Sequence, residues 1–189
     1  MSTLWWVRHG PTHRKDMIGW TDAPADLSDL GALDRLARFL PADAPVVSSD
    51  LLRASATADA IQHTRSRLPH DPALREIHFG AWEGVRFDAL PPEDTATLRA
   101  FWESPGALRA PQGESWNDLS TRVSHVADAL AQQHRHVIVV AHMGAILTQV
   151  QRARGLSAYK TLAQKIDNLS VTQLEWDGTW RDVQVNHLP

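Results

Sequence analysis

Residues 4–12 read Leu-Trp-Trp-Val-Arg-His-Gly-Pro-Thr, an apolar run that ends in a polar tip at Arg8 and His9. A short run without polar alternation predicts a strand buried on both faces, as in a parallel sheet. Residues 136–141 have the same character and are followed by His142. Ligands bind at the carboxyl ends of strands in open α/β sheets, so both histidines are expected at one shared edge.

The remaining sequence predicts strands that alternate with helices. Further strands are expected at 45–48 and 74–79, and a hairpin at 169–176 and 180–185 around Asp177 and Gly178. Helices are expected at 28–40, 51–61, 94–102, 115–130 and 143–154, with Ser28, Asp50 and Ser115 as N-terminal caps. This order predicts an α/β fold, a three-layer α/β/α sandwich with a mostly parallel central sheet.

Composition narrows the class of protein. The chain has 189 residues and 43% hydrophobic content, which predicts one domain over residues 1–189. Its 19 basic and 22 acidic side chains are mixed and give a net charge of −3, so neither nucleic acid nor membrane is an expected partner. The absence of cysteine excludes thiolate chemistry. The first residues carry no basic leader, so a cytoplasmic location is expected.

Cationic side chains at the expected strand ends are suited to binding a phosphate ester. Arg8 follows the first strand, and Arg53 falls in the first turn of the helix after the second strand. Their guanidinium groups and the helix N-terminus after His142 offer N–H donors to phosphate oxygens. His9 is the candidate nucleophile, and Gly10 permits the close backbone approach that would fix its tautomer. The arginines are expected to keep His9 neutral, whereas His142 is expected to be cationic.

The leaving oxygen of a phosphate ester also needs a proton donor. Glu76 is the first candidate because it precedes a loop rich in aromatic residues, and Glu83 and Glu114 are the alternatives. Residues 85–112 are expected to face the substrate. The ten histidines include no zinc-binding motif, so neither a metal nor a cofactor is expected.

Four segments resemble motifs of the histidine phosphatase superfamily, in the branch that holds phosphoglycerate mutases, fructose-bisphosphatases and α-ribazole phosphatases. The segments are 8–12, 48–58, 76–84 and 139–144, and Gly-Glu-Ser at 113–115 followed by Arg122 matches a further pattern. The resemblance spans nearly the whole chain and implies a phosphoglycerate mutase-like fold.

The resemblance also implies roles for individual residues. It assigns the nucleophile to His9, the proton donor to Glu76, and phosphate contacts within the catalytic set to Arg8, Arg53 and His142.

Thr12 matches the threonine that trails the first motif, whereas Pro11, Lys15 and Met143 depart from the common glutamate, asparagine and glycine. Lys15 is expected to serve the anion in place of an amide, and Met143 to offer its backbone N–H.

The implied function is hydrolysis of a small phosphorylated metabolite through a phosphohistidine. The chain is shorter than the family's mutases, and residues 19–24 resemble the α-ribazole phosphatase type, so α-ribazole 5'-phosphate is the candidate substrate. A phosphoglycerate mutase-type isomerase and a non-catalytic phospho-ligand-binding domain remain as alternatives. The expected oligomeric state is a monomer or a homodimer.

Overall fold

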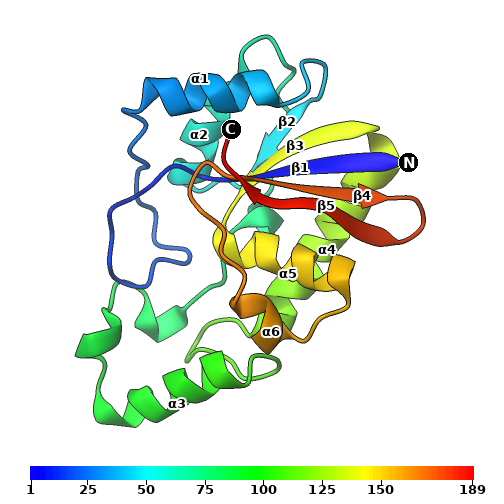
Figure 1. The fold of residues 1–189 in the computed structure, drawn as a ribbon. Helices are drawn as coiled ribbons and strands as arrows, with labels where there is room; N and C mark the ends of the chain where they lie inside the picture. The colour runs from blue at the N-terminus through cyan, green and yellow to red at the C-terminus, as the bar shows by residue number, and fades with distance from the viewer.

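Five strands form one sheet in the order β2-β3-β1-β4-β5 in the computed structural model, which describes residues 1–189 (Figure 1). Their bounds are Ser2–Arg8 for β1, Val46–Ser48 for β2, His136–Ala141 for β3, Val171–Trp176 for β4 and Trp180–His187 for β5. Strand β3 pairs in parallel with β1 and β2, whereas β4 is antiparallel to β1 and to β5. The mostly parallel sheet with an edge hairpin is therefore confirmed.

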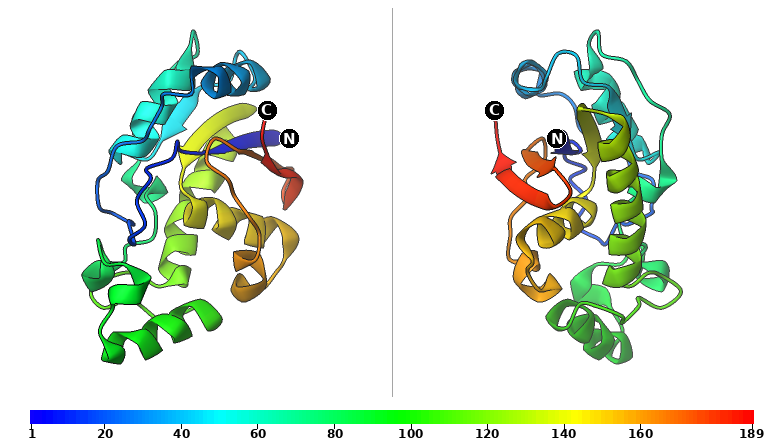
Figure 2. Two further views of the ribbon diagram at one scale, coloured as in Figure 1. Left: turned by 60° about the vertical axis from the view of Figure 1, so that its left-hand side comes forward. Right: turned by 90° about the vertical axis from the view of Figure 1, so that its right-hand side faces the viewer.

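Helices cover both faces of this sheet (Figures 1 and 2). Their bounds are Leu30–Phe39 for α1, Leu52–Gln62 for α2, Pro92–Glu103 for α3, Trp116–Gln133 for α4, Met143–Arg154 for α5 and Ala158–Leu162 for α6. Helices α1 and α2 lie on one face, α4 and α5 lie on the other, and α3 lies at the end of the molecule farthest from the sheet. The expected three layers are confirmed. No helix is both long and apolar enough to cross a membrane.

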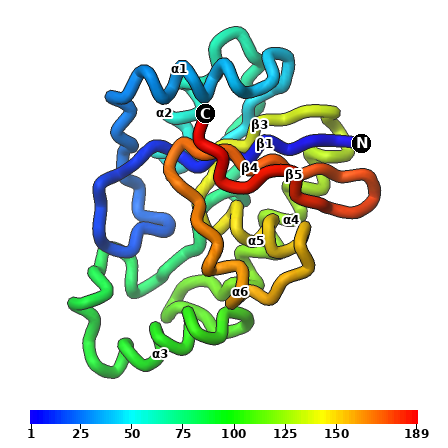
Figure 3. The backbone as a smooth tube through the Cα atoms, viewed as in Figure 1, coloured from blue at the N-terminus to red at the C-terminus, as the bar shows by residue number.

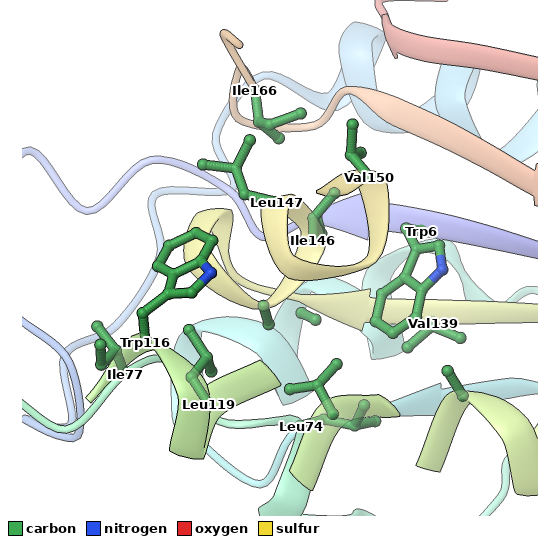
Figure 4. Close-up of a cluster of buried hydrophobic side chains, with 14 of the residues drawn as sticks. Trp6, Leu74, Ile77, Trp116, Leu119, Val139, Ile146, Leu147, Val150 and Ile166 are labelled. Atoms are coloured by element: carbon green, nitrogen blue, oxygen red, sulfur yellow. The ribbon is translucent and has the colours of Figure 1, made fainter. Parts of the chain in front are cut away.

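The buried strands explain the unbroken apolar runs of the sequence. Along β3, Val137 and Val139 belong to the core cluster beneath α4 and α5, while Ile138 and Val140 belong to the cluster beneath α1 and α2. Successive side chains of a strand point to opposite faces, and here both faces are covered, so every position from 137 to 141 is apolar. Figure 4 shows Trp6 of β1 packed on the same side of the sheet as residues of α5.

Three expected local features are wrong, and in two of them a tertiary partner competes. Helix α1 is capped by Asp29, which accepts from Ala32 N, and not by Ser28. Helix α2 has no side-chain cap because Asp50 instead forms an ion pair with Arg75.

Residues 74–79 are not a strand. Arg122 of α4 binds the main-chain carbonyls of Arg75 and Glu76 in this segment and of Ala73 just before it, which takes the place of a strand partner. By contrast, Ser115 does cap α4, in a reciprocal pair of hydrogen bonds with Asp118.

A long irregular segment, residues 9–29, joins β1 to α1 and runs beside residues 75–90 (Figure 3). Met17 ties the two together, because its N–H donates to Val85 O at 3.0 Å and its carbonyl accepts from Gly84 N at 2.8 Å. The paired segments 9–29 and 75–90 thus lie next to the carboxyl ends of the parallel strands.

Candidate functional site

The three parallel strands end side by side and bring the predicted site residues together. His9 follows β1, Ser49 follows β2 and His142 follows β3. His9 N donates to Ala141 O at 3.1 Å, and the two imidazole rings lie 5.1 Å apart, centroid to centroid. The convergence expected from the strand ends is therefore present.

The His9 ring is buried, with a fixed orientation. Its Nδ1 lies 2.7 Å from Gly10 O, so Nδ1–H is the donor and Nε2 keeps its lone pair. Gly10 N donates to Thr57 Oγ1 at 3.0 Å, and a Cβ at Gly10 would lie only 2.7 Å from Leu27 Cδ2. A side chain at position 10 would therefore force the end of Leu27 to shift.

The charge state of His9 follows from its surroundings. Burial is the largest cause that lowers the pKa of the imidazole, and Arg53 and Arg8 lower it further, to about 3. The ring is therefore neutral near pH 7. A neutral imidazole with Nε2 unprotonated is a nucleophile.

His142 is also neutral, so the prediction that it carries a charge is wrong. It is fully buried, and burial together with His9 and Arg53 holds the pKa of its imidazole well below the usual value. Nε2 lies 2.7 Å from Ser49 Oγ, which itself accepts from Leu51 N at 3.3 Å. A hydroxyl oxygen has one donor and two acceptor positions; when the Ser49 hydroxyl donates to Nε2, the proton of neutral His142 is on Nδ1. That Nδ1 is buried and has no partner.

Two arginines complete the ring of donors. Arg8 Nη1 donates to Ile166 O at 2.6 Å, and Arg53 donates through Nη1 to Thr21 O at 2.9 Å and through Nη2 to Gly19 O at 2.6 Å. Main-chain carbonyls thus already occupy some of the N–H donors of both guanidinium groups. The Nε atoms of both arginines are buried without a partner, which leaves donors available to an anion.

The carboxyl group of the predicted proton donor, Glu76, contacts the first turn of α5. Its Oε2 accepts from Gly144 N at 2.9 Å and its Oε1 from Ile77 N at 3.0 Å, and the residue is 9% exposed. One N–H of the expected helix N-terminus is therefore used by the carboxylate and not by a substrate. A Cβ at position 144 would lie 2.4 Å from Glu76 Oε1, so only glycine allows this approach.

The carboxylates of the two alternative candidates instead accept hydrogen bonds from main-chain N–H groups. Glu83 accepts from the N–H groups of Gly19, Trp20 and Thr21, within the irregular segment. Burial raises the pKa of its carboxyl, but hydrogen bonds from the Thr21 hydroxyl and from the N–H groups of Trp20, Phe79 and Thr21 outweigh burial and lower it.

Glu114 pairs with Arg122 at 2.7 Å and accepts from His78 N at 3.0 Å. Arg122 in turn donates to Glu76 O at 2.7 Å. The pair therefore fixes the backbone that carries Glu76.

The remaining predicted contacts lie at the rim. Met143 is 37% exposed, and as the first residue of α5 its N–H has no partner within the helix. Thr12 Oγ1 accepts only from Arg14 N, at 3.4 Å. Lys15 is exposed and makes no hydrogen bond or ion pair, so its anion contact stays a prediction.

Two contributors escaped the sequence reasoning. Asn168 Nδ2 donates to His9 O at 2.8 Å from the loop before β4, and no local pattern marked it. The hydroxyl of Ser49 orients His142, although the residue lies within a quoted motif and had no role there.

Comparisons with known proteins agree with this geometry. The profile of the histidine phosphatase superfamily (branch 1) matches residues 4–187. A metal-independent phosphoserine phosphatase of Arabidopsis thaliana is 30% identical, over 94% of this chain and 80% of that protein. A protein of Serratia proteamaculans named "Probable phosphoglycerate mutase GpmB" is 25% identical, over 93% of this chain and 85% of its own.

Among solved structures, the α-ribazole phosphatase of Shigella flexneri shares the fold. It superposes with a TM-score of 0.82 at 22% identity and covers 98% of this chain and 96% of its own. At that identity the likeness concerns the fold alone.

Proposed function

The chain belongs to branch 1 of the histidine phosphatase superfamily, and from this premise we propose that it hydrolyses phosphate monoesters through a phosphohistidine on His9. One observation carries the proposal. A buried, neutral imidazole with a free Nε2 lies near the side chains of Arg8, Arg53 and His142, in which Arg8 Nε, Arg53 Nε and His142 Nδ1 are buried without a protein partner. Unpaired buried donors are costly, and the oxygens of a bound phosphoryl group are acceptors for such donors.

The first half of the reaction forms the phosphoenzyme. Nε2 of His9 attacks phosphorus while the bond to the leaving oxygen breaks, and Nδ1–H stays on Gly10 O. Charge on the non-bridging oxygens is stabilised by the two guanidinium groups and the His142 N–H. Glu76, in its protonated form, gives its proton to the leaving oxygen.

The second half releases phosphate. The Glu76 carboxylate takes a proton from water, whose oxygen attacks phosphorus as the bond to Nε2 breaks. His9 returns to its neutral form, which its burial favours.

Within this class we propose α-ribazole 5'-phosphate as the substrate to test first. The segment 19–24, whose resemblance suggested that substrate, lies in the site, since Arg53 binds the carbonyls of Gly19 and Thr21.

A mutase-type activity is the second candidate, favoured by the relative named as a phosphoglycerate mutase. It would transfer the phosphoryl group from His9 back to substrate instead of to water. A non-catalytic binding domain would leave His9 unphosphorylated.

Phosphate release in chelator from α-ribazole phosphate, 3-phosphoglycerate and phosphoserine tests the proposal. His9→Ala should abolish release, whereas His13→Ala, at an exposed histidine, should keep it. Wild type should also trap an acid-labile phosphoenzyme that His9→Ala lacks. Bisphosphate-dependent interconversion of phosphoglycerates would favour the mutase, and release that persists in His9→Ala would refute the nucleophile.

A further inference from the structure

Five hydrogen-bond donors surround the carboxylate of Glu83. Its Oε2 accepts from Gly19 N at 3.1 Å, from Thr21 N at 3.0 Å and from the Thr21 hydroxyl at 2.5 Å. Its Oε1 accepts from Trp20 N at 2.7 Å and from Phe79 N at 3.0 Å. An ionised carboxylate offers about four lone pairs and no donor, so this environment matches the ionised form. The group is therefore not suited to give a proton to a substrate.

These hydrogen bonds join two irregular segments of the chain. Residues 19–21 belong to the segment that leaves β1, and Phe79 belongs to the segment that runs beside it (Figure 3). The two backbones approach so closely that a Cβ at Gly19 would overlap Ile77 O. The carboxylate of Glu83 thus fixes residues 19–21 against residues 76–79.

The carbonyls of residues 18–21 hold Arg53. Its Nη2 donates to Gly19 O at 2.6 Å and to Ile18 O at 3.4 Å, and its Nη1 donates to Thr21 O at 2.9 Å. The residue is 1% exposed, and its Nε has no partner in the protein. The orientation of the guanidinium therefore depends on where these three carbonyls lie.

Two peptide units connect Glu83 to Arg53. The unit between Gly19 and Trp20 accepts from Arg53 through its C=O. Its N–H donates to Glu83. The unit between Ile18 and Gly19 is bonded in the same way. The C=O and N–H of a trans peptide point in opposite directions, so each planar unit spans the distance from the carboxylate to the guanidinium. A charged group at each end strengthens both hydrogen bonds.

We propose that Glu83 is a positioning residue for phosphoryl transfer: its carboxylate holds residues 18–21 in the conformation whose carbonyls orient the Arg53 guanidinium toward the phosphoryl group. The proposal rests on the proposed function. Glu83 itself touches neither the substrate nor the reacting atoms. Without its carboxylate, the N–H groups of residues 19–21 lose their acceptor and the segment relaxes. A displacement of the guanidinium by about 1 Å can cost on the order of 100-fold in rate.

Glu83→Gln tests the proposal, because the amide keeps the size of the side chain but replaces one acceptor oxygen with a donor. The value of kcat/KM should fall by roughly 10- to 100-fold. The loss should be equal for p-nitrophenyl phosphate, whose leaving group needs no proton, and for glycerol 3-phosphate, whose leaving group needs one. Glu76→Gln should instead spare the aryl ester. A Glu83→Gln loss confined to glycerol 3-phosphate would make Glu83 a proton donor and overturn the proposal.

A double-mutant cycle with Arg53 separates positioning from a general effect on the fold. In the Arg53→Ala background, Glu83→Gln should change kcat/KM for the aryl ester by less than about twofold, because the group that it positions is gone. The full loss in that background would overturn the proposal. Asp29→Asn is the matched control, since it also turns into an amide a carboxylate that accepts a main-chain N–H, at the start of α1. Its activity should equal that of wild type.

The outcomes also separate this proposal from the proposed function. Unchanged kcat/KM in Glu83→Gln would overturn the positioning role and leave the phosphatase intact. A wild type that circular dichroism shows to be folded, but that hydrolyses neither ester, would overturn both. Should Arg53→Ala not fold, the comparison of the two esters still decides.

Should Glu83→Gln not fold, Thr21→Val takes its place, because it removes the hydroxyl that donates to Glu83. Its kcat/KM should fall by roughly threefold for both esters and should not fall in the Arg53→Ala background. The absence of any loss in Thr21→Val would overturn the proposal.

Discussion

Replacing Gly144 with alanine is expected to damage catalysis while leaving the fold intact. The new Cβ would lie 2.4 Å from Glu76 Oε1 and 3.2 Å from its Cδ. To regain an ordinary contact the carboxylate must retreat by about 1 Å, which breaks its hydrogen bond with Gly144 N. Because a misplacement of about 1 Å can cost on the order of 100-fold, kcat should fall by roughly 10- to 100-fold.

Stability should change little. The atom that the Cβ meets belongs to the end of a side chain, which can rotate, and Leu119 Cδ2 at 3.3 Å needs only a small shift. Alanine is also the better helix former, by up to about 1 kcal/mol. We therefore expect Tm to stay within about 4 °C of wild type.

Gly31→Ala is the matched control, because Gly31 is likewise the second residue of its helix, α1. Its Cβ would meet Arg35 Nη1 at 3.4 Å, an ordinary contact, and activity should be unchanged. Steady-state kinetics on the best phosphate ester and thermal unfolding check both variants. Full activity in Gly144→Ala would refute the position assigned to Glu76, and a large loss of Tm would show that the glycine serves the fold instead.

Two further predictions concern charge. The folded state holds His9 neutral with a pKa of about 3 against 6.5 for an unperturbed histidine, so only the unfolded state binds the proton between these values. The unfolding free energy should therefore fall as pH drops from 6.5 toward 3, by about 1.4 kcal/mol per pH unit for this group. In urea titrations, His9→Asn should make the unfolding free energy depend less steeply on pH. An unchanged dependence on pH would contradict the burial of His9 as a neutral ring. Glu114→Gln should loosen Arg122 and the Glu76 carbonyl that it holds, lowering kcat by roughly tenfold with KM little changed; an effect on KM alone would assign Glu114 to substrate binding.

Much of the fold was predictable because its signals are local. The apolar runs at 4–7 and 136–141 form β1 and β3, and the prediction of 143–154 matches α5 to the residue. The hairpin around Asp177 and Gly178 is present. In each case periodicity and turn residues act within a few positions along the chain.

The errors arise where distant groups compete with local preference. The segment at 74–79 has the composition of a strand, but Arg122, from α4, binds its carbonyls. His142 was expected to be cationic because nothing in the sequence reveals that it is fully buried beside two arginines and His9.

By itself, the sequence determined which residues stand at the ends of the parallel strands, since alternation of strands and helices places His9, Arg53 and His142 at one edge. Only the tertiary structure decided their protonation, through burial, and the position of the Glu76 carboxylate, which depends on Gly144 from a helix 68 residues away along the chain. Pattern along a chain records which face of an element is buried. Desolvation and close approach depend on what the rest of the chain brings to that face.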